Sequence, residues 1–307
     1  MKKHIIAILS LLVATSASAQ NIKTIKNGGI VAQCENHYSL GKPIVTLDTQ
    51  RVENRSFYLC RTAYAVQFDP AYKTPLWAAE NLTAERITGA KESRTDDFQP
   101  DPQVPFAAQA SLGDYKGSKF DRGHNAPAAD MKVLEGSGLN PTQAMSESFY
   151  LTNMMPQVGM NNNRGIWSDL EGQVRGWAVH KGQLLVVTGP VFVKGFSTIG
   201  QSNVAVPTYL YKVIIDPKTL NAIAFLIPNQ QIVTRRTHNL DKGNINYPQT
   251  LPNAAINCNS TCTIANFAVP VVNVEQMTGL KFFSKLPEQQ RNNIINTLNV
   301  NNWQMHD

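Results

Sequence analysis

Apolar residues in the first half of the chain fall into short runs that predict strands, separated by one long polar interval. The range 56–68 is enriched in aromatic and β-branched residues, and 73–82 continues in the same manner, so we expect an antiparallel pair of strands. From 83 to 120 the chain is rich in Pro, Asp, Gln and Gly and loses its periodicity, which predicts a long loop. A short strand over 148–157 is expected to stop at Pro156.

The second half of the chain predicts one long helix and several further strands. Between Asn163 and His180 the apolar residues recur at steps of three and four, which indicates a helix with one buried face and an asparagine as its cap. An apolar run over 183–192 predicts a buried strand. The other predicted elements are a hairpin of 207–215 with 222–227 around the turn signal Asp216-Pro217-Lys218, a strand over 267–274, and helices over 274–279 and 287–298.

The organisation of the chain predicts a leader followed by a single domain. Hydrophobic residues make up 42% of the 307 residues, enough to bury a substantial core, and neither a repeat nor a linker divides the range 20–307. We expect this range to form one domain with an irregular N-terminal entry. Two lysines, an apolar run over 5–13 and a small-residue site at 17–19 have the pattern of a secretory signal peptide over 1–19. The apolar run is shorter than the roughly 20 residues a bilayer requires, so no membrane association is expected after cleavage.

The charge of the chain is consistent with a polyanionic partner. Removal of residues 1–19 takes away two lysines and no acidic residue, so the formal net charge falls from +6 to +4. A basic protein suits DNA or RNA, although solubility alone accounts for the same charge. The leader adds the expectation of a secreted or periplasmic location.

Four cysteines predict two disulfides, because an exported chain meets an oxidising compartment. Four cysteines can be connected in three ways. We favour the connectivity that joins neighbours in sequence, which is Cys34 with Cys60 and Cys258 with Cys262. A zinc site is the alternative, since Cys-x3-Cys is an acceptable spacing for two ligands. No matching pair of ligands lies near it in the sequence.

The range 119–171 gathers the residue types that hydrolysis of a phosphodiester requires. The reaction needs an activated water, cations on the phosphoryl oxygens and help for the leaving oxygen. His124 is the natural general base, because only histidine titrates near neutral pH without special help. A lone histidine is more often structural than catalytic. Arg122 lies two residues earlier, however, and Gly123 between them would let a phosphate approach the backbone.

The other polar residues of this range have two interpretations each. Asp121 is either a metal ligand or, as we prefer, an acceptor that orients a neighbouring side chain. Asn163 is either a helix cap or a ligand through its carbonyl oxygen, because Mg²⁺ takes oxygen donors and keeps several waters. In a continuous helix Glu171 would lie about 80° round from Asn163 and roughly 12 Å along the axis, so it could hold a metal-bound water but not the ion itself. On sequence pattern alone, surface charges are expected at Arg94, Arg164 and Arg175.

Three ordered motifs span about fifty residues of this region. They are Asp121-Arg122-Gly123-His124-x-Ala-Pro, then Tyr-Leu-x-Asn-x-x-Pro-Gln over 150–157, then Asn-x-Gly-x-Trp-x-x-x-Glu over 163–171. Together they resemble the DNA/RNA non-specific endonucleases, the DRGH-type nucleases of the ββα-metal superfamily. The likeness extends more faintly over 56–286. Within the second motif, Asn153 matches a supporting asparagine near the metal.

The resemblance implies a mixed α+β fold, with a central antiparallel sheet flanked by helices, and one catalytic divalent ion. That ion is Mg²⁺ in most such enzymes, with Mn²⁺ as the alternative. By this likeness, His124 activates water, Asn163 binds the metal and Glu171 holds a metal-bound water. Arg122 contacts the phosphate or the transition state, as does an arginine in the preceding loop, for which Arg94 is the candidate.

These features predict a secreted, Mg²⁺-dependent endonuclease that cleaves DNA and RNA with little sequence preference. Contacts to phosphate and sugar carry no base information, which explains the tolerance. Two alternatives share the same residues: a phosphodiesterase acting on small nucleotides, and a nucleic-acid-binding protein on this scaffold that has lost catalysis. A complete set of base, arginines and metal ligand argues against the loss of catalysis.

Overall fold

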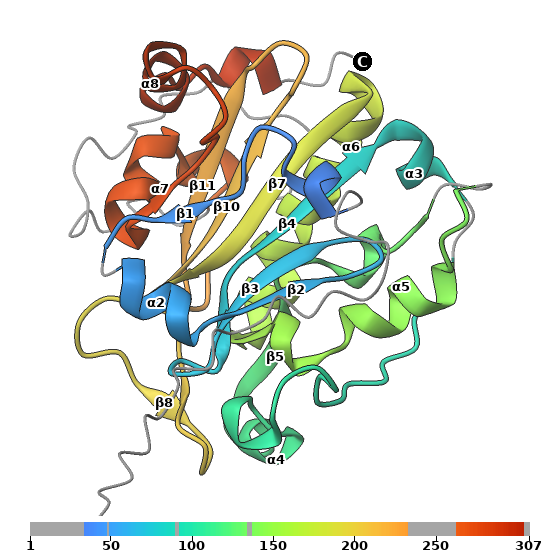
Figure 1. The fold of residues 1–307 in the computed structure, drawn as a ribbon, viewed down its shortest axis with the longest axis vertical. Coiled ribbons are helices and arrows are strands. Elements are labelled where there is room, and N and C mark those ends of the chain that lie inside the picture. Colours follow the sequence, from blue (N-terminus) through green and yellow to red (C-terminus); the bar gives the residue numbers. More distant parts are fainter. Residues whose placement is uncertain (1–33, 48, 90–91, 134–136, 233–261, 304–307) are drawn as a thin grey trace, which may run out of the picture.

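A seven-stranded sheet forms the centre of the computed structural model, which describes residues 34–47, 49–89, 92–133, 137–232 and 262–303 (Figure 1). Every pair of neighbouring strands in this sheet is antiparallel. The predicted α+β fold with a central antiparallel sheet is therefore confirmed. In spatial order the strands are β12 (Ala268–Val269), β11 (Ala222–Pro228), β10 (Tyr209–Ile215), β7 (Gln183–Val191), β4 (Thr74–Thr83), β3 (Ala65–Asp69) and β2 (Phe57–Cys60).

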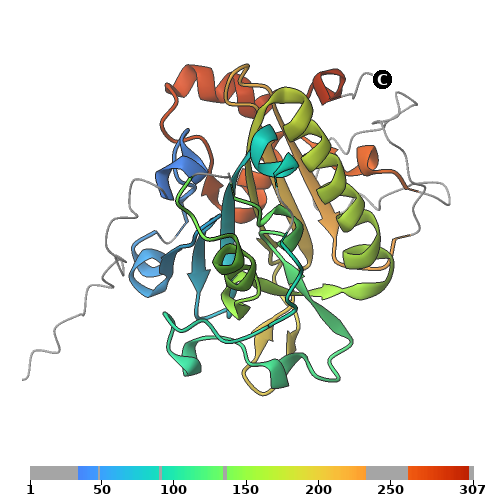
Figure 2. The ribbon, with the colours of Figure 1, turned by 90° about the vertical axis from the view of Figure 1, so that its right-hand side faces the viewer.

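Helices cover both faces of the sheet (Figure 2). Side chains alternate between the two faces along each strand, so one strand contributes to two apolar clusters. In β10, Leu210 and Ile214 pack in the cluster under α6, whereas Tyr211 and Val213 pack in the cluster on the opposite face. The helices are α6 (Trp167–Lys181) on the first face and α7 (Val271–Thr278) and α8 (Glu288–Asn296) on the second.

Shorter elements surround the sheet. Two-stranded pairs are formed by β1 (Ile44–Val45) with β13 (Leu280–Lys281), β5 (Phe120–His124) with β6 (Met154–Val158), and β8 (Thr198–Ile199) with β9 (Val204–Ala205). Short helices are α2 (Thr49–Arg55), α3 (Ala84–Thr88), α4 (Leu112–Tyr115), α5 (Pro141–Ser148) and the single turns η1 (Asn36–Tyr38) and η4 (Leu151–Asn153). In the described ranges, no helix combines the length and apolar composition that a membrane span requires.

Most of the predicted strands are present, with one correction at 56–68. That range forms β2 and β3, because the chain reverses between them in a turn where the Arg61 N–H donates to the Tyr64 carbonyl over 2.8 Å. The strands β4, β7, β10 and β11 lie close to their predicted ranges. Asp216 makes the predicted hairpin turn by accepting a hydrogen bond from the Lys218 N–H over 2.9 Å.

Three other boundaries differ from the predictions. The range 83–120 is irregular for most of its length but contains α3 and α4. The strand predicted over 148–157 begins only at Met154, since α5 and η4 occupy the residues before it. The strand predicted over 267–274 is reduced to β12, because Pro270 cannot continue the ladder and starts α7 instead.

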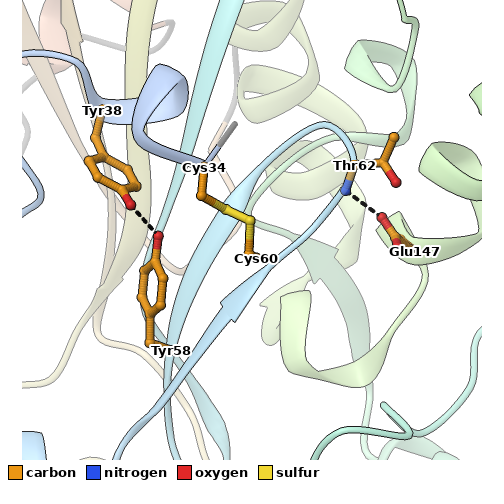
Figure 3. Close-up of a disulfide and its surroundings, with 6 residues drawn as sticks. All are labelled: Cys34, Tyr38, Tyr58, Cys60, Thr62 and Glu147. Carbon is orange, nitrogen blue, oxygen red and sulfur yellow. Dashed lines mark hydrogen bonds between the residues drawn. A yellow bond between two sulfur atoms is a disulfide. The ribbon is translucent and has the colours of Figure 1, made fainter. Parts of the chain in front are cut away.

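One disulfide links the N-terminal part of the described chain to the sheet (Figure 3). Cys34 bonds to Cys60 at the end of β2, with their Cα atoms 5.8 Å apart, which confirms this predicted pair. Cys258, and with it the predicted pair of Cys258 and Cys262, lies outside the described residues. The same holds for the leader predicted over 1–19.

Loss of this disulfide is expected to lower the free energy of unfolding by about 2–4 kcal/mol. The bond restricts the unfolded chain across a sequence separation of 26 residues. The variant Cys34→Ser/Cys60→Ser would be compared with the unaltered protein by urea denaturation, followed by circular dichroism. An unchanged urea midpoint in a two-state transition would show that the bond contributes no stability.

Candidate active site

Two antiparallel strands followed by a helix carry most of the predicted site residues. In the pair of β5 and β6, Asp121 lies opposite Gln157, and α6 follows β6 after an irregular turn. This is the strand, strand and helix order that the resemblance implies. No element was predicted for β5, because Asp121, Arg122 and His124 interrupt the apolar alternation by which a strand is recognised.

Gly123 is required by packing inside this strand pair. A Cβ atom at this position would lie 2.2 Å from Oε1 and 2.7 Å from Cβ of Gln157. The Gln157 side chain is held in place, because it is buried and donates to Asn162 Oδ1 over 3.0 Å. The expectation that Gly123 leaves room for a phosphate is therefore wrong, since Gln157 fills that space.

His124 ends β5 in a buried, aromatic environment. Its ring makes edge contacts with Phe98 and Phe149, at centroid distances of 5.7 and 5.1 Å. Its Nε2 atom is buried and has no hydrogen-bond partner among the described residues. Burial, together with Arg94 and Arg122, lowers the pKa of His124 to about 3. The imidazole is therefore neutral at physiological pH, and its Nε2 atom is open as an acceptor.

Two arginines flank this histidine and lie against the same aromatic pair. The Arg122 guanidinium is 3.9 Å from the ring centroid of Phe98, and the Arg94 guanidinium is 4.9 Å from that of Phe149. These cation–π contacts aim both charges at the space beside His124. Arg94 keeps half of its side chain exposed and pairs with Asp96 over 2.7 Å, so it lies at the rim.

Asn163 lies in an irregular turn and not in the helix. The range Gly159–Ile166 departs from helical geometry at several positions, and α6 begins only at Trp167. The predicted helix start at Asn163, and the helical spacing from it to Glu171, are therefore wrong. The non-helical residues are Met160, Asn161 with a φ of 60°, Arg164 and Gly165.

The contacts of two neighbouring asparagines differ sharply. Asn163 Nδ2 donates to Asp121 Oδ2 over 3.0 Å, and its carbonyl oxygen makes no hydrogen bond to any described residue. Asn162 is fully buried, where Nδ2 donates to the carbonyls of Pro228 and Gln230 over 2.8 and 2.7 Å. Of these two side-chain amides, only that of Asn163 therefore has a carbonyl oxygen available to a ligand.

Asp121 lies where an orienting acceptor is needed. Besides the bond from Asn163, its Oδ2 is 3.3 Å from Arg164 Nη1. Arg164 is exposed, as expected for a surface charge, but it also lines the wall of the site. By fixing the Asn163 amide, Asp121 leaves the carbonyl oxygen as the donor for a cation.

Glu171 lies in the second turn of α6 and is partly buried. Burial is the main cause that raises its pKa to about 7, with Lys212 opposing this rise and Asp130 adding to it. The sequence predicts a surface position for Arg175, but the residue is partly buried and donates through Nη1 to Asp130 Oδ1 over 2.8 Å. Its position four residues after Glu171, on the same side of a helix, was the available signal.

Asn153 supports the site from within the protein. It is fully buried, and its Oδ1 accepts from the Ala126 N–H over 3.0 Å. Its Nδ2 donates to the carbonyls of Ala126 and Ser148, both over 2.9 Å. It fixes the chain that follows His124 and is not part of the cavity wall.

One cavity of about 900 Å³ brings the predicted site residues together, with the exception of Asn153. In the part of the chain that the structure describes, no cluster of three His, Cys, Asp or Glu side chains could hold a metal ion. A divalent ion at this site would rely on few protein ligands and several waters, as Mg²⁺ commonly does. The cavity wall includes Arg94, Asp121, Arg122, His124, Asn163 and Glu171.

Sequence comparison places this site in a known family. A model of the DNA/RNA non-specific endonuclease family matches residues 45–289. The chain belongs to this family. Nuclease 1, mitochondrial, of Schizosaccharomyces pombe is 35% identical over 246 residues, which cover 74% of this chain and 66% of that protein. Nuclease C1 of Cunninghamella echinulata var. echinulata is 35% identical over 243 residues, which cover 75% of this chain and 83% of that protein.

A solved structure agrees with the family assignment. The crystal structure of an EndoG/EndoGI complex matches with a TM-score of 0.59 and 29% sequence identity, over 76% of this chain and 88% of that one. The predictions of a nuclease family and of its fold class are confirmed. Members of the family depend on a divalent metal. The chain spans 66% of the length of the S. pombe relative and 61% of that of a nuclease EXOG from Danio rerio.

The predicted secreted or periplasmic location is contradicted by these relatives. The S. pombe nuclease is named as mitochondrial, and so are relatives from animals and budding yeast. The expectation rested on the leader alone, and basic residues followed by apolar ones are a weak basis for separating one kind of targeting segment from another.

Proposed function

We propose that this member of the non-specific endonuclease family is a Mg²⁺-dependent endonuclease that hydrolyses DNA and RNA without strong sequence preference. The observation that carries the proposal is the grouping of His124, two arginines and the Asn163 carbonyl in one cavity. The His124 Nε2 atom is buried without a partner among the described residues, and its low pKa keeps it neutral. A neutral imidazole with a free nitrogen suits a general base.

The chain's own residues divide the work of the reaction. His124 accepts the proton of the attacking water, and Arg94 and Arg122 stabilise the charge that develops on the phosphoryl oxygens. Both guanidiniums are held by aromatic rings, so little reorganisation is needed when the substrate enters. Because these groups address phosphate, they explain cleavage without base recognition.

The residues present fit a hard divalent cation. The Asn163 carbonyl oxygen would hold the ion, oriented by Asp121, and Glu171 would accept hydrogen bonds from the waters around it. When bound, the ion neutralises charge on the phosphate and assists the leaving oxygen. Asn153 holds the backbone that follows His124, so it supports the base rather than the ion.

Digestion of plasmid DNA, single-stranded DNA and RNA, each with Mg²⁺ or with EDTA, tests the proposed function. We expect all three polymers to be cut in Mg²⁺ and none in EDTA, with internal cleavage converting supercoiled plasmid to open circles. Hydrolysis of dinucleotides but not of polymers would favour the small-nucleotide phosphodiesterase. Binding without cleavage in Mg²⁺ and in Mn²⁺ would favour the non-catalytic alternative.

The pH dependence of cleavage should follow Glu171. Its pKa of about 7 means that the carboxylate is lost below that pH, whereas His124 stays neutral throughout. At limiting Mg²⁺, kcat/KM reports the groups of the free enzyme, so it should rise about tenfold per pH unit up to about pH 7 and then level off. Glu171→Gln should be less active and lack this limb. If kcat/KM of Glu171→Gln still rises in the same way up to about pH 7, a group other than Glu171 causes the rise.

A further inference from the structure

A lysine is buried at the centre of the sheet beneath the active site. Lys212 lies in β10, is 1% exposed, and donates through Nζ to Thr188 Oγ1 over 2.6 Å. Its ammonium lies 5.1 Å from the ring centroid of Trp167. No carboxylate of the described chain pairs with it at ion-pair distance. A buried ammonium is costly unless it is paired, so its position requires an explanation.

Stability does not explain the position of this lysine. Its neighbours on the same face of β10, Leu210 and Ile214, are apolar and pack under α6. Trp167 is the first residue of α6, so the ammonium lies against the ring of a residue of that helix. An apolar residue would suit the position better.

Glu171 is the carboxylate that can use this charge. It lies one turn after Trp167 on the same side of α6, and it lines the cavity. Burial lowers the pKa of Lys212, and Glu171 is the group that opposes this most strongly. Burial raises the pKa of Glu171, and Lys212 is the group that opposes that rise most strongly. The other charged groups that face Glu171 are Asp130, which raises its pKa, and Arg175, which lowers it.

A second buried carboxyl group does not take this role. Glu80 in β4 is 1% exposed, and its Oε1 has no hydrogen-bond partner in the described ranges. Burial, reinforced by Asp130, raises the pKa of Glu80 well above its ordinary value, although Arg86 and Lys212 oppose the rise. Burial therefore opposes the charged form of Glu80, and Glu171, not Glu80, lies in the cavity wall.

We propose that Lys212 is a positioning residue that keeps Glu171 in its charged form from beneath α6, ready to accept hydrogen bonds from the water shell of a metal ion. The metal part of this inference rests on the proposed function. The link between Lys212 and Glu171 does not, and it can be measured in the absence of both metal and nucleic acid.

The first experiment follows the Glu171 carboxyl carbon by ¹³C NMR in metal-free protein, with the signal assigned by its loss in Glu171→Gln. Lys212→Met removes the charge but keeps the length of the side chain. In this variant the titration midpoint of the Glu171 carboxyl group should rise by at least about one pH unit. Lys218→Met is the matched control, because exposed Lys218 lies in the turn after β10 and its loss changes net charge equally. Equal midpoints in Lys212→Met and the unaltered protein would overturn the proposal.

The second experiment measures Mn²⁺ binding by electron paramagnetic resonance, without nucleic acid, over a series of pH values. Lys212→Met should bind Mn²⁺ more weakly near pH 7 and regain its affinity at higher pH, once Glu171 is ionised. In a Glu171→Gln background, Lys212→Met should no longer move the pH midpoint of binding. The proposal would be overturned if the pH midpoint of Mn²⁺ binding were the same in Lys212→Met and Lys218→Met. It would also be overturned if Lys212→Met still shifted that midpoint in the Glu171→Gln background.

The fold of these variants separates a positioning role from a structural one. Replacement of a buried charge by an apolar side chain of similar volume is often neutral or stabilising, so Lys212→Met should keep its urea midpoint. Lys212→Gln is a second neutral variant with a donor for Thr188. If neither variant folds, the ammonium serves stability and the proposal is wrong. Absence of cleavage by the unaltered protein would instead count against the proposed function alone.

Discussion

The variant His124→Ala is expected to lose at least about 10³-fold in kcat on plasmid DNA while it retains its affinity for the polymer. His124 is the one histidine in the described cavity wall, and its buried Nε2 is free of partners among the described residues. Arg94 and Arg122 remain in the variant, so binding of phosphate should persist. The measurements are single-turnover cleavage at saturating Mg²⁺ and binding of a labelled duplex in EDTA.

Three controls separate loss of the base from loss of the fold. Urea denaturation should show a modest change, because the ring makes edge contacts with Phe98 and Phe149 but no hydrogen bond through Nε2. His180→Ala, in an exposed position on α6, should cleave at the unaltered rate. Added imidazole should restore part of the activity of His124→Ala and none to an arginine variant. A well-folded His124→Ala protein of normal activity would refute the role of this residue.

The sequence predicts the scaffold better than it predicts the site. Helix α6 was recognised because Ile166, Leu170 and Trp177 repeat at helical spacing, and all three are buried. The sequence pattern does not predict β5, because charged residues interrupt the alternation of apolar and polar side chains that is typical of a strand. The residue types predict helix through the turn that holds Asn163, but the backbone torsions at Gly165 are not helical.

Contacts between distant segments account for most of what the sequence could not predict. Phe98 and Phe149 lie about fifty residues apart in the sequence, yet together they hold His124 and both arginines. Lys212 did carry a signal, as a lysine within an otherwise apolar strand, but its proximity to Trp167 depends on the packing of α6. Local pattern reveals such residues as exceptions and leaves their partners undetermined.

The variant Asn163→Ala is expected to raise the Mg²⁺ concentration required for half-maximal cleavage by at least about 10–100-fold, the range seen when support around a metal is lost. No cluster of His, Cys, Asp and Glu side chains in the described ranges could replace the lost carbonyl. Asp121 Oδ2 would lose the hydrogen bond from Asn163 but keep Arg164 beside it, and it could then attract the ion weakly. Saturating metal should therefore restore part of the rate. Cleavage would be measured across a Mg²⁺ series, and metal affinity directly with Mn²⁺.

The adjacent residue supplies the matched control. Asn162→Ala removes the same side chain from a buried position, where it bonds to Gln157, Pro228 and Gln230. It should lower the free energy of unfolding by about 1–3 kcal/mol and leave the metal requirement of the folded protein unchanged. Asp121→Asn should have an intermediate effect on metal affinity, because its side chain orients Asn163 without holding the ion. Equal Mg²⁺ requirements in Asn163→Ala and the unaltered protein would show that Asn163 is not the ligand. A raised Mg²⁺ requirement in folded Asn162→Ala would show that Asn162 has been passed over as the ligand.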